Sequence, residues 1–476
     1  MTEYSDIVKP ASRAISSDIT NVDTLADIPA GSVGEFHLST GKLVSGDGNG
    51  IGTELVIKKL LNRLSNNTYL ELPVNPEAPT LTLSADAATT TISGAVTTIN
   101  MDNALVYCPG KMTFVASAAG NGGPTQNYYG DLADSYSPYT IVTNALEVEL
   151  SVMVPAPTVP ALVQLIIDGQ LAQKTAYVGS IAASSNIWKK MKFVFPTAKT
   201  RRITFLIARV LVSSFAISSK YKFFPVSEPA LRMYAITDSY GGGGYWGHFS
   251  KSIDQDLAAA IGVEGTTLNY VGSTGYKAAP SGKSFISRFE AYVTARGAPD
   301  IVMVSGGIND TTAYTQAESY AAILDFYTRA KAVAPNALYI VVGNMVPQQA
   351  QYSSQPSNGW VRASIESVIQ SIGVHYIYLS TLNNTILSSW GTVYDDSASN
   401  GGVILNNPNA LFTGNSTVAT AATDTSSYLY VDSDTVHPTT GITPSTGAES
   451  AYSDQCGRAY ISRFVLNGVR QAINNW

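Results

Sequence analysis

Residues 233–247 read MYAITDSYGGGGYWG, an apolar run that ends in Asp238-Ser239 and is followed by four glycines. Further apolar runs come after it, and the segments between the runs have the apolar spacing of helices. Those runs are Leu268–Val271, Ile301–Val304, Leu338–Val342 and His375–Leu379. Apolar runs that alternate with helical segments predict a parallel sheet with helices on both faces. We therefore expect residues 230–476 to form an α/β domain around a doubly wound parallel sheet.

Two helix starts and one interruption are visible within this region. Thr315-Gln-Ala-Glu318 and Thr446-Gly-Ala-Glu449 have the spacing of a capping box, which predicts that a helix begins at each of them. Residues 380–432 are rich in Asn, Gly, Ser and Thr, and they break the alternation of strands and helices. We interpret them as a long insertion near the rim of the active site.

Strands rather than helices are predicted upstream of residue 230. Several runs between about 140 and 228 alternate polar and apolar residues, and turns such as Asp168-Gly-Gln170 separate them. This pattern predicts a jelly-roll-like β-sandwich over residues 131–229, for which a carbohydrate-binding module and a structural spacer are both open. Residues 1–130 are rich in Gly, Thr and Asn, and they are expected to be a β-rich attachment region.

The charge content excludes several classes of function. Charged residues make up 13% of the chain and the net charge is −6, whereas an average protein has about 25% charged residues. No long basic run is present to neutralise phosphates, so nucleic acid is not an expected partner. The uncharged stretch Leu150–Ile167 contains three prolines, which predicts strand and loop rather than insertion into a membrane. A surface made polar by Ser, Thr, Asn and Gln suits an extracellular or virion protein that faces carbohydrate.

Polar residues with complementary chemistry follow the predicted strands. A serine hydroxyl needs a base to take its proton, and His437 is a candidate base for Ser239. Asp434 precedes His437 by three residues and could hold the imidazole in the right tautomer. The oxyanion would require donors, for which we consider the Ser239 N–H, a glycine N–H and the side-chain amide of Asn309. Reacting groups gather at the carboxyl ends of strands in an open parallel sheet, which is where these residues fall.

These residues resemble the SGNH (GDSL-type) hydrolase family, whose members carry four short blocks in a fixed order. The corresponding stretches here are TDS at 237–239, GSTG at 272–275, GIND at 307–310 and DTVH at 434–437. The resemblance spans about residues 230–476 and implies the three-layer, flavodoxin-like fold of the family. It implies that Ser239, Asp434 and His437 form the catalytic triad. It also implies that Gly275 and Asn309 join the Ser239 N–H in the oxyanion hole.

The match departs from the family at one position and is ambiguous at another. Thr237 stands where most members have a glycine, which is expected to tighten the turn at Asp238 without removing chemistry. The second block holds two glycines, and Gly275 is preferred over Gly272 because Tyr276 follows it, which resembles the GTGY sequence of some family members. In the third block, Asp310 is expected to brace its loop rather than to react.

Aromatic residues flank the predicted nucleophile and the second block. Tyr240, Tyr245, Trp246 and Tyr276 are candidates for stacking on a sugar ring, and core packing is the alternative for each of them. No group of Cys and His residues has the spacing of a zinc site. No metal and no cofactor are therefore expected.

The resemblance and the composition together favour a serine esterase. A sandwich followed by an SGNH-type domain resembles carbohydrate acetylesterases, and the N-terminal region resembles a bacteriophage tail spike or fibre. This implies an enzyme of the virion that removes O-acetyl groups from an acetylated bacterial polysaccharide, a capsule or O-antigen, at the host surface. The N-terminal region would then join other phage tail proteins, and a homotrimer is implied because such spikes are commonly trimeric.

Two further functions stay open. One is a free bacterial GDSL-type esterase or lipase that acts on small or lipid esters, although residues 380–432 are too polar for a lipase lid. The other is a non-catalytic receptor-binding spike on a hydrolase scaffold, which would have no need of the complete set of four blocks. The N-terminus lacks the basic start and apolar core of a secretory signal peptide, which agrees with release of a phage protein by host lysis.

Overall fold

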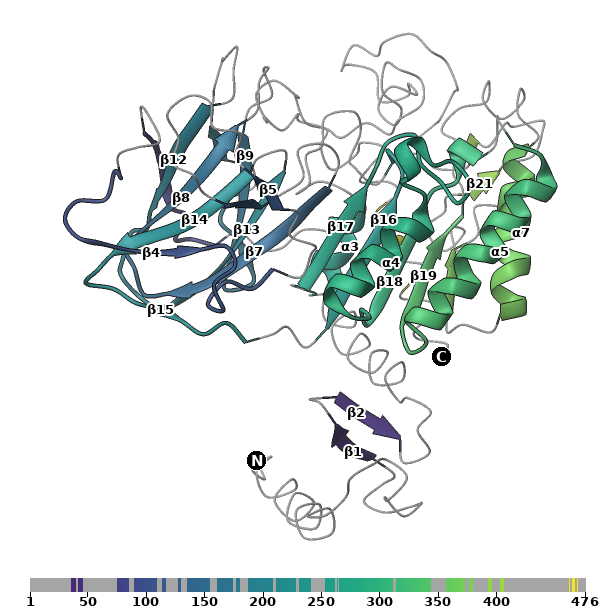
Figure 1. Ribbon diagram of the computed structural model, residues 1–476, viewed down its shortest axis with the longest axis horizontal. Helices are drawn as coiled ribbons and strands as arrows, with labels where there is room; N and C mark the ends of the chain where they lie inside the picture. Colours follow the sequence, from purple (N-terminus) through teal and green to yellow (C-terminus); the bar gives the residue numbers. More distant parts are fainter. Residues whose placement is uncertain are drawn as a thin grey trace.

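The computed structural model describes a β-sandwich, an α/β domain and a few isolated strands (Figure 1). The described residues are 36–39, 42–45, 75–84, 90–108, 114–116, 127–129, 135–154, 161–173, 177–179, 187–208, 211–227, 231–240, 253–261, 263, 265–310, 314–343, 357–372, 376–379, 393–395, 403–405, 462, 465–466 and 469. Two antiparallel pairs stand outside the main sheets: β1 (Phe36–Ser39) with β2 (Lys42–Ser45), and β21 (Val393–Asp395) with β22 (Val403–Leu405).

The sandwich consists of two antiparallel layers. One layer has the order β3 (Thr80–Leu83), β12 (Ile187–Val194), β8 (Glu147–Val154), β14 (Leu211–Ser218), β6 (Asn127–Tyr129) and β5 (Phe114–Ala116), with β4 (Val96–Asn100) on β14. The other has the order β10 (Gln170–Leu171), β9 (Ala161–Ile167), β13 (Arg201–Ala208) and β7 (Ser135–Thr143). Two short strands extend it, β11 (Tyr177–Gly179) on β9 and β15 (Phe223–Phe224) on β7.

The predicted start of the sandwich at residue 131 is too late. Strands β3 to β6 all precede that residue, and they pair within the same layer as β8, β12 and β14. These strands are short and lie far in sequence from their partners, as in the pairing of Leu81 with Phe193. Pairing over such separations leaves no local signal, which explains why the sequence placed the boundary after them.

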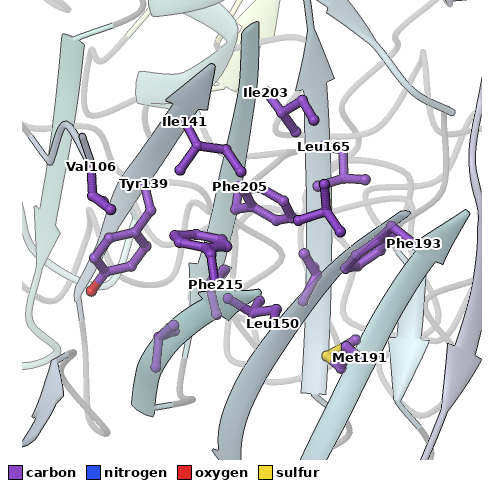
Figure 2. Packing of buried hydrophobic residues seen from close by; sticks show 14 of the residues in the cluster. Val106, Tyr139, Ile141, Leu150, Leu165, Met191, Phe193, Ile203, Phe205 and Phe215 are labelled. Carbon is purple, nitrogen blue, oxygen red and sulfur yellow. The ribbon is translucent and has the colours of Figure 1, made fainter. Parts of the chain in front are cut away.

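Alternation along the strands builds the core of the sandwich. Val148, Leu150 and Val152 occupy every second position of β8, and all three are buried in one cluster. Aromatic rings fill the centre of that cluster: the Phe205 ring centroid lies 5.7 Å from that of Phe193 and 4.9 Å from that of Phe215 (Figure 2). Side chains with this two-residue period face one way on a pleated strand, so the layers meet through these residues.

The predicted parallel sheet is confirmed. Its strands are β17 (Gly265–Tyr270), β16 (Arg232–Thr237), β18 (Ile301–Ser305), β19 (Leu338–Val342) and β20 (Tyr376–Leu379), in that spatial order and all parallel. Its helices are α3 (Ile253–Ile261), α4 (Phe285–Arg296), α5 (Gln316–Val333) and α7 (Ser357–Ile372). Each of the five apolar runs in the sequence therefore corresponds to one strand.

Helices cover both faces of this sheet. Helices α4, α5 and α7 share one buried cluster with residues of β16, β18 and β19. Helix α3 connects β16 to β17, and this step runs along the sheet in the direction opposite to the steps from β17 to β18, β19 and β20. Because crossovers are right-handed, α3 lies on the other face of the sheet. On that side Ser462 donates a hydrogen bond to Asp256 of α3 at 2.5 Å. The capping box predicted at Thr315–Glu318 opens α5, and the one predicted at Thr446–Glu449 lies outside the described residues.

The two domains share one continuous sheet. Strand β7 of the sandwich pairs antiparallel with β17 of the α/β domain, joining Tyr136 to Leu268 and Ser135 to Asn269 (Figure 1). The result is an 11-stranded mixed sheet that runs through both domains. The sequence predicted a purely parallel sheet here, because nothing in either strand indicates that they meet. Among the described residues, no helix combines the length and apolarity that crossing a membrane requires.

Candidate active site

Ser239 lies where the sequence places it, directly after β16. The strand is buried from Met233 to Thr237, and Ser239 is the first half-buried side chain beyond it. The preceding Asp238 is buried, and its Oδ1 accepts the N–H of Tyr240 at 3.0 Å. The buried strand and the bond from Asp238 to the turn beyond it together hold Ser239 at the carboxyl edge of the sheet.

Asp238 also ties the nucleophile turn to the loop after β18. Its Oδ2 accepts the N–H of Gly307 at 3.1 Å. The loop continues through the short 3₁₀ turn η5 (Ile308–Asp310), which contains Asn309. The first and third blocks are therefore linked through one buried carboxyl group.

Asp310 braces the loop of the second block, whereas the expectation from the sequence was that it braces its own loop. Its Oδ2 accepts the N–H of Tyr276 at 2.7 Å, and its Oδ1 accepts the N–H groups of Lys277 at 3.0 Å and Ala278 at 2.7 Å. Burial raises the pKa of Asp310, and the three N–H bonds oppose that rise without cancelling it. The carboxyl group is buried and accepts three backbone hydrogen bonds, so its role is to hold the loop.

Asn309 presents its amide from the same turn. Its Nδ2 donates to the carbonyl of Thr274 at 2.9 Å, and the side chain is half-buried. An amide nitrogen carries two hydrogens, so this bond orients the group and leaves a second N–H for an acceptor. That arrangement is compatible with the oxyanion role predicted for Asn309.

The N–H of Gly275, the predicted glycine donor of the oxyanion hole, already has a hydrogen-bond partner within the protein. The Gly275 N–H already donates to the carbonyl of Ala278 at 2.9 Å, which closes a tight turn. For Gly275 to serve the oxyanion as predicted, its N–H would have to exchange that partner. Gly272, the second candidate, lies in the same loop and is half-buried.

The rest of the predicted site divides into buried and undescribed residues. Tyr240 and Tyr276 are each 3% exposed, so neither ring is open to a sugar. Both residues therefore pack in the core, which was the alternative considered from the sequence. The Tyr276 hydroxyl pairs with that of Tyr327 at 2.9 Å inside the helical cluster. The remaining predicted residues, Asp434, His437, Tyr245 and Trp246, lie outside the described part of the chain.

A buried arginine near the site was missed by the sequence analysis. Arg288 of α4 donates hydrogen bonds to Thr237 and to Thr274, which belong to the first and second blocks. The sequence feature that could have revealed Arg288 is a charged residue within the apolar stripe formed by Phe285, Phe289 and Tyr292. Within the described ranges, no three His, Cys, Asp or Glu side chains are grouped in a way that could hold a metal ion.

A further buried acid lies on helix α3. Asp254 in the first turn of α3 is fully buried, and neither of its oxygens has a hydrogen-bond partner within the part of the chain that the structure describes. Burial raises the pKa of Asp254 well above its usual value, and the nearby Asp238 and Asp256 raise it further. The folded protein therefore keeps a proton on Asp254 that the unfolded chain releases above its pKa of about 3.8. This carboxyl group lowers stability progressively as the pH rises from that value.

We expect Asp254→Asn to raise the free energy of unfolding at pH 7, by about 1–2 kcal/mol, because the amide cannot ionise. At pH 4 the gain should nearly vanish, since carboxyl and amide are then both neutral. Thermal unfolding at the two pH values measures the difference. Asp325→Asn removes an exposed carboxylate from α5 and should give no gain that grows with pH. An equal effect of Asp254→Asn at both pH values would contradict the raised pKa.

Part of the α/β domain matches a known protein family. Residues 236–440 match the GDSL-like Lipase/Acylhydrolase family. This GDSL-like segment begins at the end of β16, contains strands β17 to β20, and includes all five predicted catalytic and oxyanion residues: Ser239, Gly275, Asn309, Asp434 and His437. The match supports the SGNH-type hydrolase fold for the segment.

Solved structures of carbohydrate esterases are also similar to the chain. A family two carbohydrate esterase from Cellvibrio japonicus shares 12% identity at a TM-score of 0.44, covering 60% of this chain and 88% of that one. Another from Clostridium thermocellum shares 12% at 0.41, covering 56% and 87%. An acetyl xylan esterase from the rumen bacterium Butyrivibrio proteoclasticus shares 14% at 0.39, covering 60% and 90%. Among curated proteins, none matches the sequence.

Proposed function

We propose that the protein is a serine esterase with Ser239 as its nucleophile. The observation that carries this proposal is the joint placement of Ser239 at the end of β16 and of the Asn309 amide on the neighbouring loop, within the GDSL-like segment. Ser239 attacks the ester carbonyl, and the oxyanion forms where the Ser239 N–H and the Asn309 amide can stabilise it.

His437 takes the proton of Ser239 in this mechanism and passes it to the departing alcohol. Asp434 orients the imidazole and stabilises its charged form. Water then attacks the acyl-enzyme with His437 as base, which releases the acid and restores Ser239. The spacing of these two residues in the sequence supports the assignment.

The proposed substrate is an O-acetyl ester on a bacterial surface polysaccharide, either capsule or O-antigen. The low charge content of 13% supports it, because most polar side chains of the protein are then neutral donors and acceptors, which can hydrogen-bond to sugar hydroxyls. The biological setting that we propose is a bacteriophage tail spike or fibre, which acts outside the host cell and joins other tail proteins through its N-terminal region. A homotrimer is part of that setting.

The decisive experiment follows acetate release from an O-acetylated bacterial polysaccharide by NMR, for the wild-type protein and for Ser239→Ala. We expect release by the wild type alone. Absence of Ser239-dependent acetate would contradict the deacetylase. Faster turnover of long-chain than of acetyl esters would favour a lipase, and equal binding of the polysaccharide by both proteins without turnover would favour a receptor-binding protein.

A further inference from the structure

The buried guanidinium group of Arg288 connects the nucleophile strand to the loop that holds the Asn309 amide. We propose that Arg288 is a positioning residue that sets the spacing between the Ser239 nucleophile and the Asn309 amide. The inference rests on the proposed esterase function and adds a residue to it. Arg288 lies on α4, is 7% exposed, and extends toward the carboxyl edge of the sheet through its hydrogen bonds to β16 and β17.

The guanidinium group holds the nucleophile strand and the second-block loop at the same time. Its Nη2 donates to the carbonyl of Thr237 at 3.0 Å and to Oγ1 of Thr274 at 3.0 Å. Its Nη1 donates to the carbonyl of Asn269 at 2.7 Å and to Oδ1 of the same residue at 3.0 Å. Four bonds from one planar group therefore fix the ends of β16 and β17 and the loop beyond β17.

Each end of this network is close in the chain to a reacting group. Thr237 precedes Ser239 by two residues. The hydroxyl of Thr274 donates to the carbonyl of Val271 at 2.6 Å, and the carbonyl of Thr274 accepts the Asn309 amide at 2.9 Å. One residue, Thr274, thus separates Arg288 from the predicted oxyanion donor. A shift of Thr274 would move the Asn309 amide relative to Ser239.

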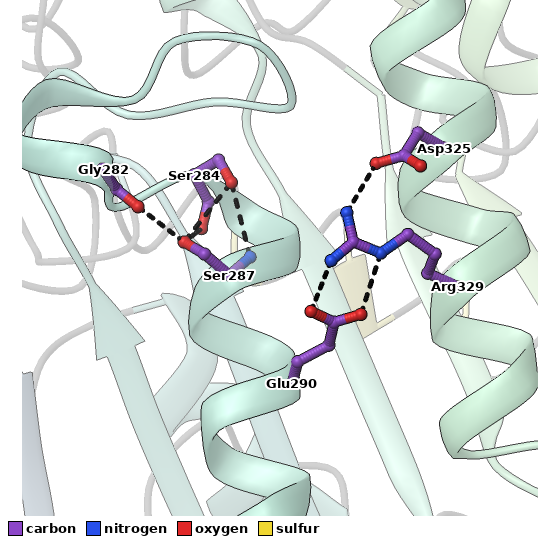
Figure 3. Close-up of polar contacts among 6 residues, drawn as sticks. All are labelled: Gly282, Ser284, Ser287, Glu290, Asp325 and Arg329. Carbon is purple, nitrogen blue, oxygen red and sulfur yellow. Dashed lines mark hydrogen bonds and ion pairs between the residues drawn. The ribbon is translucent and has the colours of Figure 1, made fainter.

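The environment of Arg288 suits arginine and not lysine. The guanidinium lies over the Phe285 ring, with 5.1 Å between Cζ and the ring centroid. Its fork supplies separate N–H groups to Asn269 on one side and to Thr237 and Thr274 on the other, which a single ammonium cannot reproduce in one geometry. The start of α4 is itself fixed, because Ser284 Oγ accepts the N–H of Ser287 at 3.3 Å (Figure 3).

Loss of this support should lower kcat more than it changes KM. Arg288 makes its contacts with the protein and not with the substrate, so ground-state binding is not directly affected. The oxyanion donor matters most when charge develops on the ester oxygen, and a displacement of about 1 Å can cost about 10²-fold in rate.

The test compares Arg288→Ala and Arg288→Lys with Arg329→Ala, using hydrolysis of 4-nitrophenyl acetate by the full chain. Arg329 is the matched control: it lies on α5 and contacts Glu290 of α4 and Asp325, but it contacts no described residue of the site (Figure 3). We expect kcat to fall about 10²-fold in Arg288→Ala with little change in KM. Added guanidinium ion should restore part of kcat in Arg288→Ala and none in Arg329→Ala.

Thermal unfolding separates misfolding from mispositioning. If Arg288→Ala does not fold, Arg288→Lys decides, because it keeps the charge and the aliphatic stem and should still lose about 10-fold in kcat. A folded Arg288→Lys with the kcat of Arg329→Ala, or a loss confined to KM, would overturn the inference while leaving the esterase proposal intact. If the wild type and Ser239→Ala hydrolyse the ester equally slowly, the esterase proposal fails and the role of Arg288 falls with it.

Discussion

Ser239→Ala is expected to lower kcat for ester hydrolysis by about 10⁴-fold or more. The methyl group cannot attack a carbonyl, so no acyl-enzyme forms. The remaining rate would come from the oxyanion donors alone, since the substitution leaves the backbone N–H at position 239 in place. Because the half-buried side chain loses only a hydroxyl, the unfolding midpoint should stay close to that of the wild type.

The matched control for this prediction is Ser273→Gly. Ser273 is an exposed serine of the neighbouring second-block loop, and it has a φ of 61°, a conformation that glycine adopts without strain. It should keep wild-type turnover. A fluorophosphonate probe followed by mass spectrometry should label Ser239 in the wild type and in Ser273→Gly. Labelling at another serine would show that the nucleophile is misassigned.

Gly275→Ala is expected to destabilise the fold by about 3 kcal/mol and to lower activity with it. A Cβ at residue 275 would lie 2.7 Å from Cγ of Asp310, too close for two carbon atoms that are not bonded to each other. Asp310 cannot move aside freely, because three backbone N–H groups of residues 276–278 hold its carboxyl oxygens. The substitution must therefore break part of the link between the second and third blocks.

Gly272→Ala is the matched control in the same loop. A Cβ at residue 272 would meet no atom within 4 Å, so the free energy of unfolding should be close to that of the wild type. Chemical denaturation and hydrolysis of 4-nitrophenyl acetate measure both variants. If both variants unfold alike, the close packing of Asp310 on Gly275 is not what makes a glycine necessary there.

The parts of the fold that could be predicted from sequence are those with local signals. Each apolar run after residue 230 became a strand of the parallel sheet, and the capping box at Thr315–Glu318 became the start of α5. The pairing of the strands before residue 131 with the sandwich, and the pairing of β7 with β17, could not be predicted. Both depend on contacts between residues far apart in the chain, which neither periodicity nor turn residues encode.

The candidate site follows the same division. Ser239, Asn309 and Asp310 come directly after strands, so their place at one sheet edge could be predicted from the strand order. The direction of a side chain could not: Tyr276 follows Gly275 in sequence, yet its ring packs inward against Tyr327 and Phe326. Arg288 was missed because its partners are mostly backbone carbonyls and hydroxyls, which no sequence motif records.

The strand pairing between the two domains has a mechanical consequence for the site. Asn269 is paired with Ser135 of the sandwich on one side and with Ile236 of the nucleophile strand on the other. It is also the residue whose carbonyl and side chain are held by Arg288. A displacement of the sandwich would therefore be transmitted through Asn269 to the loops of the proposed site. The pairing of β7 with β17 joins the sandwich to the α/β domain by strand pairing, which a domain tethered by a linker alone would lack.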